Sequence, residues 1–170
     1  YPCFCSRADL HAAQAPHASD GAYVYAGTCR NLNKSEREEL SKHKIPATRI
    51  RVPNKTYAFE DKVYGQTSQN LSKLCGDFIV QRADEVFAYQ LAVVVDDADM
   101  GVTEVVRGSD LLSSTPRQLY LQDVLGFSHP IYAHLPLLVA PDGRRLSKRN
   151  HDLDLGVLRD QRKLLRISLM

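Results

Sequence analysis

The chain has 170 residues, 44% hydrophobic and 25% charged, which is typical of a soluble globular protein with one domain or a small pair. Its net charge of +2 neither favours nor excludes nucleic acid as a partner, because local clusters of charge matter more than the total. No apolar run approaches the roughly 20 residues that cross a membrane, and no basic-then-apolar leader occurs, so we expect a cytoplasmic protein without a membrane partner.

The first half of the chain indicates short helices and strands. Ser6-Arg7-Ala8-Asp9 and Ser35-Glu36-Arg37-Glu38 are capping-box patterns, which predict one helix near Leu10 and another through Lys42. Three stretches rich in β-formers are expected to make a small antiparallel sheet, namely residues 48–52, 57–61 and 77–82.

The second half indicates a strand, a polar turn and a helix. Residues 88–95 fit either a helix or a buried strand, and we favour the helix. Residues 102–106 are a β-branched run that predicts a buried strand, ending in Arg107-Gly108, where glycine permits a sharp turn. A helix over 116–125 then begins behind hydroxyl N-cap candidates. Open α/β sheets bind ligands beyond their strand ends, so this turn is a candidate site.

Beyond this helix, we expect residues 131–139 to be extended and residues 153–169 to be helical. Between them a basic loop follows a Pro-Asp-Gly turn, and its cations are Arg144, Arg145, Lys148 and Arg149. Such a loop suits a polyphosphate or a nucleic-acid backbone. On composition alone, a solvated surface loop is the simpler interpretation.

Other polar residues of this half also have two interpretations. Arg107 could bind a ligand or only pair with Asp110 on the same turn. Tyr89 could be a core aromatic whose hydroxyl finds a local partner. Asp96 and Asp97 could be paired catalytic carboxylates, although turn residues that cap the neighbouring backbone fit better.

Three cysteines have a spacing that favours a metal site over a disulfide framework. Cys3 and Cys5 straddle a tight turn, and Cys29 closes a longer loop. A structural zinc ion takes four ligands in a tetrahedron. Spacing alone leaves the fourth ligand open, with the candidates His11, His17 and Tyr25. The alternative is that these cysteines are small buried thiols, as we expect Cys75 to be.

Several motifs follow one another in an order that is not generic. They are Cys-x-Cys, Tyr-x-x-x-Cys-Arg, Gly-Asp-Phe, Tyr-Gln-Leu-Ala-Val-Val-Val-Asp-Asp, Arg-Gly-Ser-Asp-Leu-Leu, Thr-Pro-Arg-Gln, His-Leu-Pro-Leu and Arg-Leu-Ser-Lys. In this order the chain closely resembles the glutamyl-Q tRNA(Asp) synthetases, short class I relatives of glutamyl-tRNA synthetase. The resemblance covers nearly the whole chain.

The resemblance implies an α/β fold, the second half of a class I synthetase Rossmann-type catalytic domain with a zinc-binding α+β insertion. It places the zinc-bearing insertion in residues 1–88 and the second half of the nucleotide-binding fold in residues 89–150. Residues 151–170 would begin a C-terminal helical segment.

The resemblance also implies site residues. The zinc ligands would be Cys3, Cys5, Tyr25 and Cys29. Tyr89 and Arg107 match residues that hold glutamate, and their chemistry fits, because a guanidinium grips a carboxylate bidentately and a phenol donates to it. The ATP-binding signature loop would be Arg145, Leu146, Ser147, Lys148 and Arg149. Within it Lys148 would be catalytic, steadying the triphosphate while pyrophosphate leaves.

The implied reaction has two steps and no covalent enzyme nucleophile. ATP, with Mg²⁺, and L-glutamate give glutamyl-adenylate, and the glutamyl group then passes to queuosine in the tRNA(Asp) anticodon. We expect a monomer with bound Zn²⁺. The family's His-x-Gly-His signature lies in the first half of the nucleotide-binding fold, and the six histidines here never take that arrangement. We therefore expect this chain alone not to activate glutamate.

Two other functions compete with this one. Many glutamyl-tRNA synthetases that charge tRNA(Glu) have a histidine two residues after the third cysteine, where this chain has Asn31. A non-catalytic, zinc-stabilised RNA-binding module is the other rival. The pairing of Tyr89 with Arg107 argues against it, because such a module needs no amino-acid pocket.

Overall fold

The computed structural model describes residues 1–6, 8–9 and 24–139. The basic loop at 144–149, the helix expected at 153–169, and both His11 and His17 lie outside the described residues. The chain divides into two compact units, Tyr1–Leu135 and Pro136–Met170, and the elements below belong to the first. Within the described ranges, no helix combines the length and the apolarity that a bilayer crossing requires.

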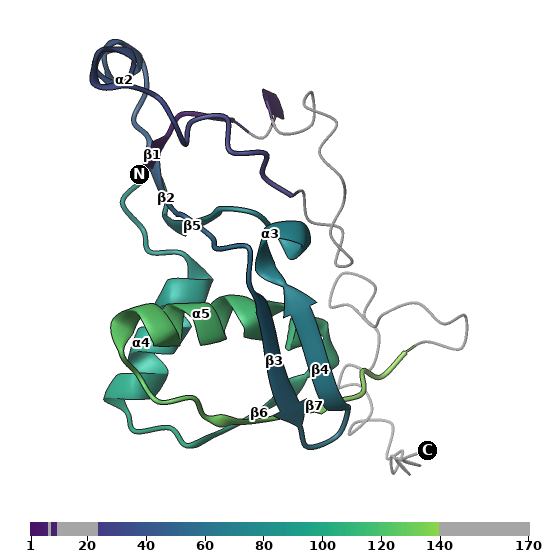
Figure 1. The fold of residues 1–170 in the computed structure, drawn as a ribbon. Coiled ribbons are helices and arrows are strands. Elements are labelled where there is room, and N and C mark those ends of the chain that lie inside the picture. Colours follow the sequence, from purple (N-terminus) through teal and green to yellow (C-terminus); the bar gives the residue numbers. More distant parts are fainter. Residues whose placement is uncertain (7, 10–23, 140–170) are drawn as a thin grey trace, which may run out of the picture. The chain divides into compact units, whose positions relative to one another are not determined.

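The described residues of the first unit form two β-sheets, whose strands are labelled in Figure 1. The smaller sheet is antiparallel, in the order β1 (Pro2–Cys3), β2 (Ala47–Ile50) and β5 (Phe78–Gln81). The larger sheet is mixed, in the order β4 (Gly65–Asn70), β3 (Thr56–Asp61), β7 (Ile131–Leu135) and β6 (Glu104–Gly108). Strands β3 and β4 form an antiparallel hairpin, whereas β7 runs parallel to both β3 and β6.

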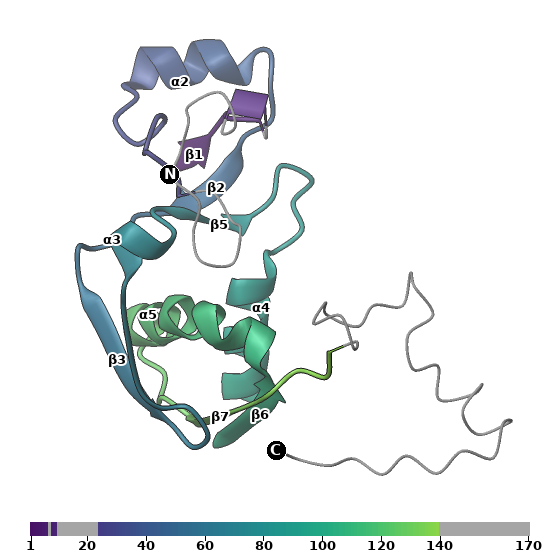
Figure 2. The same cartoon turned by 90° about the vertical axis from the view of Figure 1, so that its right-hand side faces the viewer.

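Four α-helices and one 3₁₀ helix that lie wholly within the described residues accompany the sheets. They are α2 (Lys34–Ser41), α3 (Leu71–Leu74), α4 (Tyr89–Asp99), η1 (Ser109–Ser114) and α5 (Thr115–Leu125). Helices α4 and α5 lie side by side next to the larger sheet in both views (Figures 1 and 2). The main core forms where α4, α5, the larger sheet and β5 meet, and its buried residues include Tyr57, Phe78, Val94, Leu119 and Tyr132.

The strand–turn–helix prediction around Arg107 is confirmed with two corrections. The strand is β6, shifted to Glu104–Gly108, and it is not buried, since Val106 is 58% exposed. The reason is its place at the end of the described sheet, with β7 as its neighbour on one side. Gly108 has a φ of −67°, which any residue adopts, so the turn there does not need glycine. Helix α5 does end at Gly126, whose φ of 73° suits glycine.

Other predictions were right in type and wrong in placement. The helix expected at 88–95 is α4, and Asp96 and Asp97 lie inside it rather than in a turn. Residues 57–61 do not join 48–52 and 77–82 in one sheet, because β3 pairs with β4 and β7. Strand β4 escaped prediction because its sequence, GQTSQN, lacks β-branched alternation.

The capping box of α2 is also displaced from the predicted one. Asn33 caps the helix by accepting from the backbone N–H of Glu36, and the Glu36 carboxylate accepts from the backbone N–H of Asn33. The predicted box at Ser35–Glu38 is therefore wrong by two residues. Asparagine at the N-cap satisfies the same orphan donors as serine.

Candidate functional site

Arg107 lies at the end of β6, directly opposite His134 in the parallel register of β7. Its Nε donates to His134 Nε2 over 2.9 Å, and its Nη2 donates to the Thr115 hydroxyl over 2.8 Å and to the Leu111 carbonyl over 3.4 Å. The guanidinium also lies 5.3 Å from the centre of the Tyr132 ring. Groups from β7, the 3₁₀ turn and helix α5 thus converge on one cation at the end of β6.

Tyr89 opens helix α4, and the structure brings it to Arg107. Burial lowers the pKa of the Arg107 guanidinium, and the nearby side chains of Tyr132, Tyr89 and Asp97 partly offset this, Tyr89 also through a hydrogen bond. Tyr89 is 52% exposed, so it is not the core aromatic of the alternative interpretation. A guanidinium and a phenol therefore share one half-open location, and the charge of the Asp97 carboxylate favours the charged form of Arg107 there.

A buried polar pair lies behind Arg107. His134 and Asp61 are 0% and 1% exposed, and His134 Nδ1 is 2.6 Å from an oxygen of the Asp61 carboxylate. The same carboxylate accepts the backbone N–H groups of His134, Val63 and Tyr64. Burial alone raises the pKa of Asp61, but the hydrogen bonds from His134 and from these backbone groups outweigh it and bring that pKa to about 2.

A second buried polar chain joins α4 to α5 beside this location. Gln118 donates to Gln90 over 2.9 Å, and Gln90 donates to the Ser114 hydroxyl over 3.0 Å. Gln118 and Ser114 are both buried, and Thr115, which binds Arg107, follows Ser114 directly. Buried polar groups need partners, so this chain fixes the position at which α5 begins.

The three predicted cysteine ligands form a compact cluster at the other sheet. The sulfur atoms of Cys3, Cys5 and Cys29 all lie within 4.8 Å of one another, with Cys5 and Cys29 3.6 Å apart. The Tyr25 hydroxyl lies 3.5 Å from the Cys3 sulfur and 3.8 Å from the Cys5 sulfur. Zn–S bonds of about 2.3 Å in a tetrahedron set sulfur atoms about 3.8 Å apart, so the donor set fits a tetrahedral ion.

Neighbouring N–H groups support this sulfur cluster. Arg49 is buried, donates from Nε to the Cys3 sulfur over 3.2 Å, and lies 3.8 Å from the centre of the Tyr25 ring. The backbone N–H of Phe4 donates to the Cys29 sulfur over 3.4 Å. Burial raises the pKa of Cys3, but hydrogen bonds from Tyr25, from the backbone and from Arg49 lower it overall, which favours a thiolate ligand.

Tyr25 reaches the cluster because of a glycine far along the chain. Tyr25 forms an isolated parallel bridge with Gly76, and its backbone N–H donates to the Cys75 carbonyl over 3.1 Å. Gly76 has a φ of +60°, and a Cβ there would overlap the Tyr25 carbonyl oxygen. Cys75 itself is buried in the main core, as predicted, and is not one of the clustered cysteines.

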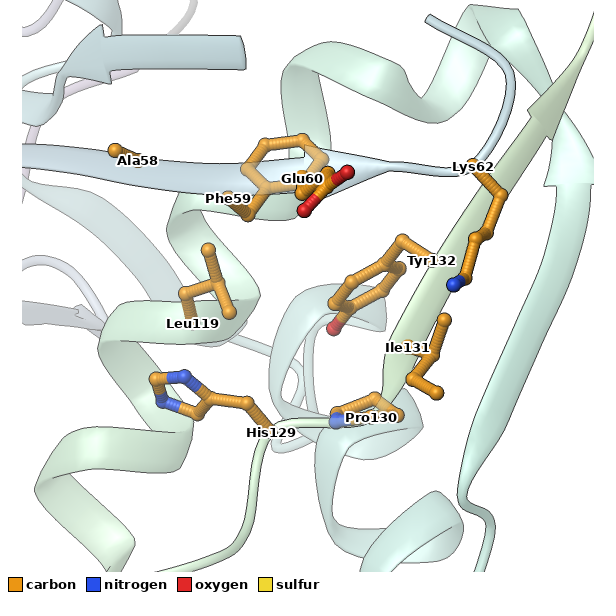
Figure 3. A pocket seen from close by; sticks show the side chains of 9 residues that line it. All are labelled: Ala58, Phe59, Glu60, Lys62, Leu119, His129, Pro130, Ile131 and Tyr132. Atoms are coloured by element: carbon orange, nitrogen blue, oxygen red, sulfur yellow. The ribbon is translucent and has the colours of Figure 1, made fainter. Parts of the chain in front are cut away.

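A hollow among the described residues lies elsewhere. It has a volume of about 330 Å³ between β3, the end of α5 and the start of β7, and it is shown in Figure 3. Phe59 and Tyr132 form its apolar wall, and Glu60, Lys62 and His129 add polar groups. Neither Tyr89 nor Arg107 lines it, so we do not assign the amino-acid site to this hollow.

Sequence reasoning found Arg107, Tyr89 and the cysteines but missed the residues that hold them. His134 and Asp61 had no motif that linked them, since they are far apart in the sequence and meet only through strand pairing. Thr115 and Gln118 were noted only as parts of a helix start and of the Thr-Pro-Arg-Gln motif. Arg145, Leu146, Ser147, Lys148 and Arg149 lie outside the described residues, and their role stays a prediction.

The comparisons with known proteins agree with the resemblance. A family model described as tRNA synthetases class I (E and Q), catalytic domain, matches residues 1–164. The chain is 52% identical over 161 residues to the glutamyl-Q tRNA(Asp) synthetase of Geobacter sulfurreducens, covering 94% of this chain and 49% of that protein. It is 49% identical over 162 residues to the enzyme of that name in Nitratidesulfovibrio vulgaris, covering 94% and 50%.

The fold is also similar to that of a solved structure. The glutamate–tRNA synthetase of Elizabethkingia anophelis superposes with a TM-score of 0.70 at 25% identity, over 88% of this chain and 32% of that one. The chain spans about half the length of the curated relatives it matches. With the family model covering nearly all of its length, the chain belongs to the catalytic-domain family of the class I tRNA synthetases for glutamate and glutamine.

Proposed function

We propose that the natural protein containing this chain activates L-glutamate with ATP and transfers the glutamyl group to queuosine in the anticodon of tRNA(Asp). Relatives that are 49% to 53% identical over most of the chain carry the name glutamyl-Q tRNA(Asp) synthetase. In keeping with this, Asn31 occupies the place where many tRNA(Glu)-charging relatives have a histidine.

The observation that carries the proposal is the environment of Arg107. Partial burial removes some of the water around this guanidinium, and its hydrogen-bond acceptors in β7, η1 and α5 are neutral: an imidazole nitrogen, a hydroxyl and a carbonyl. A partly desolvated cation whose hydrogen-bond acceptors are neutral attracts an anion. The phenol of Tyr89 beside it can donate a further hydrogen bond. Together they suit the side-chain carboxylate of glutamate.

The chemistry would depend on positioning and charge neutralisation. Arg107 and Tyr89 would hold the side chain of glutamate so that its α-carboxylate attacks the α-phosphate of ATP, with pyrophosphate leaving. Lys148, within the signature loop Arg145–Arg149, would neutralise charge that develops on the departing phosphates, and Mg²⁺ would accompany ATP. The adenylate would then be attacked by a hydroxyl of queuosine, releasing AMP.

We also propose that Cys3, Cys5, Cys29 and Tyr25 hold a structural Zn²⁺. The spacing of the sulfur and phenol oxygen atoms supports this, as does the support that Arg49 and Phe4 give to the sulfur atoms. A zinc ion there would tie β1 to the segment around Cys29 and would contribute folding free energy. It would stabilise the fold and take no part in glutamate activation.

Charging assays test the proposal on the natural gene product. The protein should attach glutamate to queuosine-containing tRNA(Asp) and leave tRNA(Glu) uncharged, with queuosine-free tRNA(Asp) as the matched control. Charging of tRNA(Glu) instead would identify a glutamyl-tRNA synthetase. Salt-sensitive RNA binding without any charging would identify the non-catalytic zinc module.

A further inference from the structure

We propose that Asp61 and His134 are positioning residues that fix the Arg107 guanidinium for the carboxylate of the substrate. This inference rests on the proposed function of Arg107. It gives a role to two residues that had none from the sequence, one from the hairpin β3–β4 and one from β7.

The contacts fix the tautomer of His134. Arg107 Nε–H can only donate, so His134 Nε2, 2.9 Å away, must be the acceptor. The imidazole proton then resides on Nδ1, which donates to the Asp61 carboxylate at 2.6 Å. Donation therefore runs in one direction, from guanidinium to imidazole to carboxylate. A carboxylate that accepts from imidazole makes the opposite nitrogen a better acceptor.

Backbone N–H groups fix this series of hydrogen bonds at its carboxylate end. One oxygen of Asp61 accepts the N–H groups of Val63 and Tyr64 at 3.0 and 2.9 Å, which closes the turn between β3 and β4. The other oxygen faces His134 Nδ1. Since Asp61 and His134 are both buried, water does not compete for the contact between them. The guanidinium is thereby held in one plane.

The Asp61→Asn substitution should switch the His134 imidazole to its other tautomer. The amide oxygen must remain where Val63 and Tyr64 donate, so the amide NH₂ must face His134 Nδ1. Nδ1 then has to accept, and the imidazole proton moves to Nε2, where it opposes Arg107 Nε–H. Two donors face each other, and Arg107 loses its fixed orientation although its charge is unchanged.

The experiment uses the natural gene product and two readouts. Nitrogen-15 NMR of the His134 ring should show the Nδ1–H tautomer at pH 7 and the Nε2–H tautomer in Asp61→Asn. Pyrophosphate exchange should show a KM for glutamate raised about tenfold to a hundredfold in Asp61→Asn, with the KM for ATP unchanged. Asp77→Asn is the matched control, because Asp77 is also a buried, hydrogen-bonded carboxylate but lies against Arg30, Val52 and Tyr1.

A pair of variants at His134 separates positioning from packing. His134→Gln can place an acceptor near the position of Nε2, whereas His134→Leu fills similar space without one. A positioning role predicts that the KM for glutamate rises in His134→Leu and stays close to that of the unmodified protein in His134→Gln. If the leucine variant does not fold, Asp61→Asn carries the comparison.

Equal KM values in all variants, or the Nε2–H tautomer in the unmodified protein, would overturn the inference. If the tautomer switches as expected while Arg107→Ala leaves the glutamate KM unchanged, the proposed role of Arg107 fails instead.

Discussion

Gly76→Ala tests how the structure places Tyr25 in the cysteine cluster. An alanine Cβ at this position would lie 3.2 Å from the Tyr25 nitrogen, 3.3 Å from its carbonyl carbon, and in overlap with its carbonyl oxygen. These are backbone atoms, so no side-chain rotation can relieve the overlap. Gly76 also has a φ of +60°, a conformation that alanine adopts only with strain.

The expected cost has two parts. The left-handed conformation alone costs alanine about 1–2 kcal/mol. Relief of the overlap must move the Tyr25 segment away from Gly76, which breaks the hydrogen bond from Tyr25 N–H to the Cys75 carbonyl, a further ~1 kcal/mol. We therefore expect Gly76→Ala to lower the free energy of unfolding by about 2–3 kcal/mol and to weaken metal binding, since Tyr25 moves with its backbone.

Gly65→Ala is the matched control. Gly65 has a φ of +69°, and a Cβ there would meet no atom within 4 Å, so this variant shows the conformational strain without the overlap. Denaturant unfolding gives the stability of both variants, and competition with a chelating dye gives their zinc affinity. Equal stability losses, with zinc affinity unchanged in Gly76→Ala, would refute the close approach of Gly76 to Tyr25.

Three further predictions concern single side chains. Cys5→Ser should release zinc and make residues 1–30 more susceptible to proteolysis, and metal analysis that finds no zinc in the native chain would leave the cluster as packing only. The pKa of Asp61 is lowered from 3.8 to about 2, so its ionised form contributes about 2 kcal/mol of stability above pH 4, which is lost as the pH falls toward 2. The unfolding free energy of Asp61→Asn should therefore depend less steeply on pH in this range. An identical pH dependence in the variant and the unmodified protein would contradict this prediction. Tyr89→Phe in the natural gene product should raise the glutamate KM about fivefold to tenfold without changing that for ATP, as measured by pyrophosphate exchange; an unchanged glutamate KM would remove the phenol from the site.

The sequence predicted the local features that depend on short patterns. Helix α5 begins with Pro116 among its first residues and ends at a left-handed glycine, and both signals are local. The clustering of Cys3, Cys5 and Cys29 was also predictable, because few arrangements of three thiols at this spacing avoid a common centre.

What the sequence could not predict depends on strand pairing. Strand β3 was assigned to the wrong sheet, because its alternating pattern shows which residues are buried but not which strand lies beside it. The contact of Asp61 with His134 follows from that pairing, so it was invisible before the topology was known. Val106 looked buried because β-branched runs usually are, yet among the described strands β6 has a neighbour, β7, on one side only.

Glutamate-dependent exchange of pyrophosphate into ATP is the most direct test of the central claim, that Arg107 binds the carboxylate of glutamate. We predict exchange by the natural gene product that requires glutamate, and a loss of about a hundredfold or more in kcat/KM for glutamate in Arg107→Ala, with the KM for ATP unchanged. Exchange that proceeds equally well in Arg107→Ala, or that depends on a different amino acid, would contradict it.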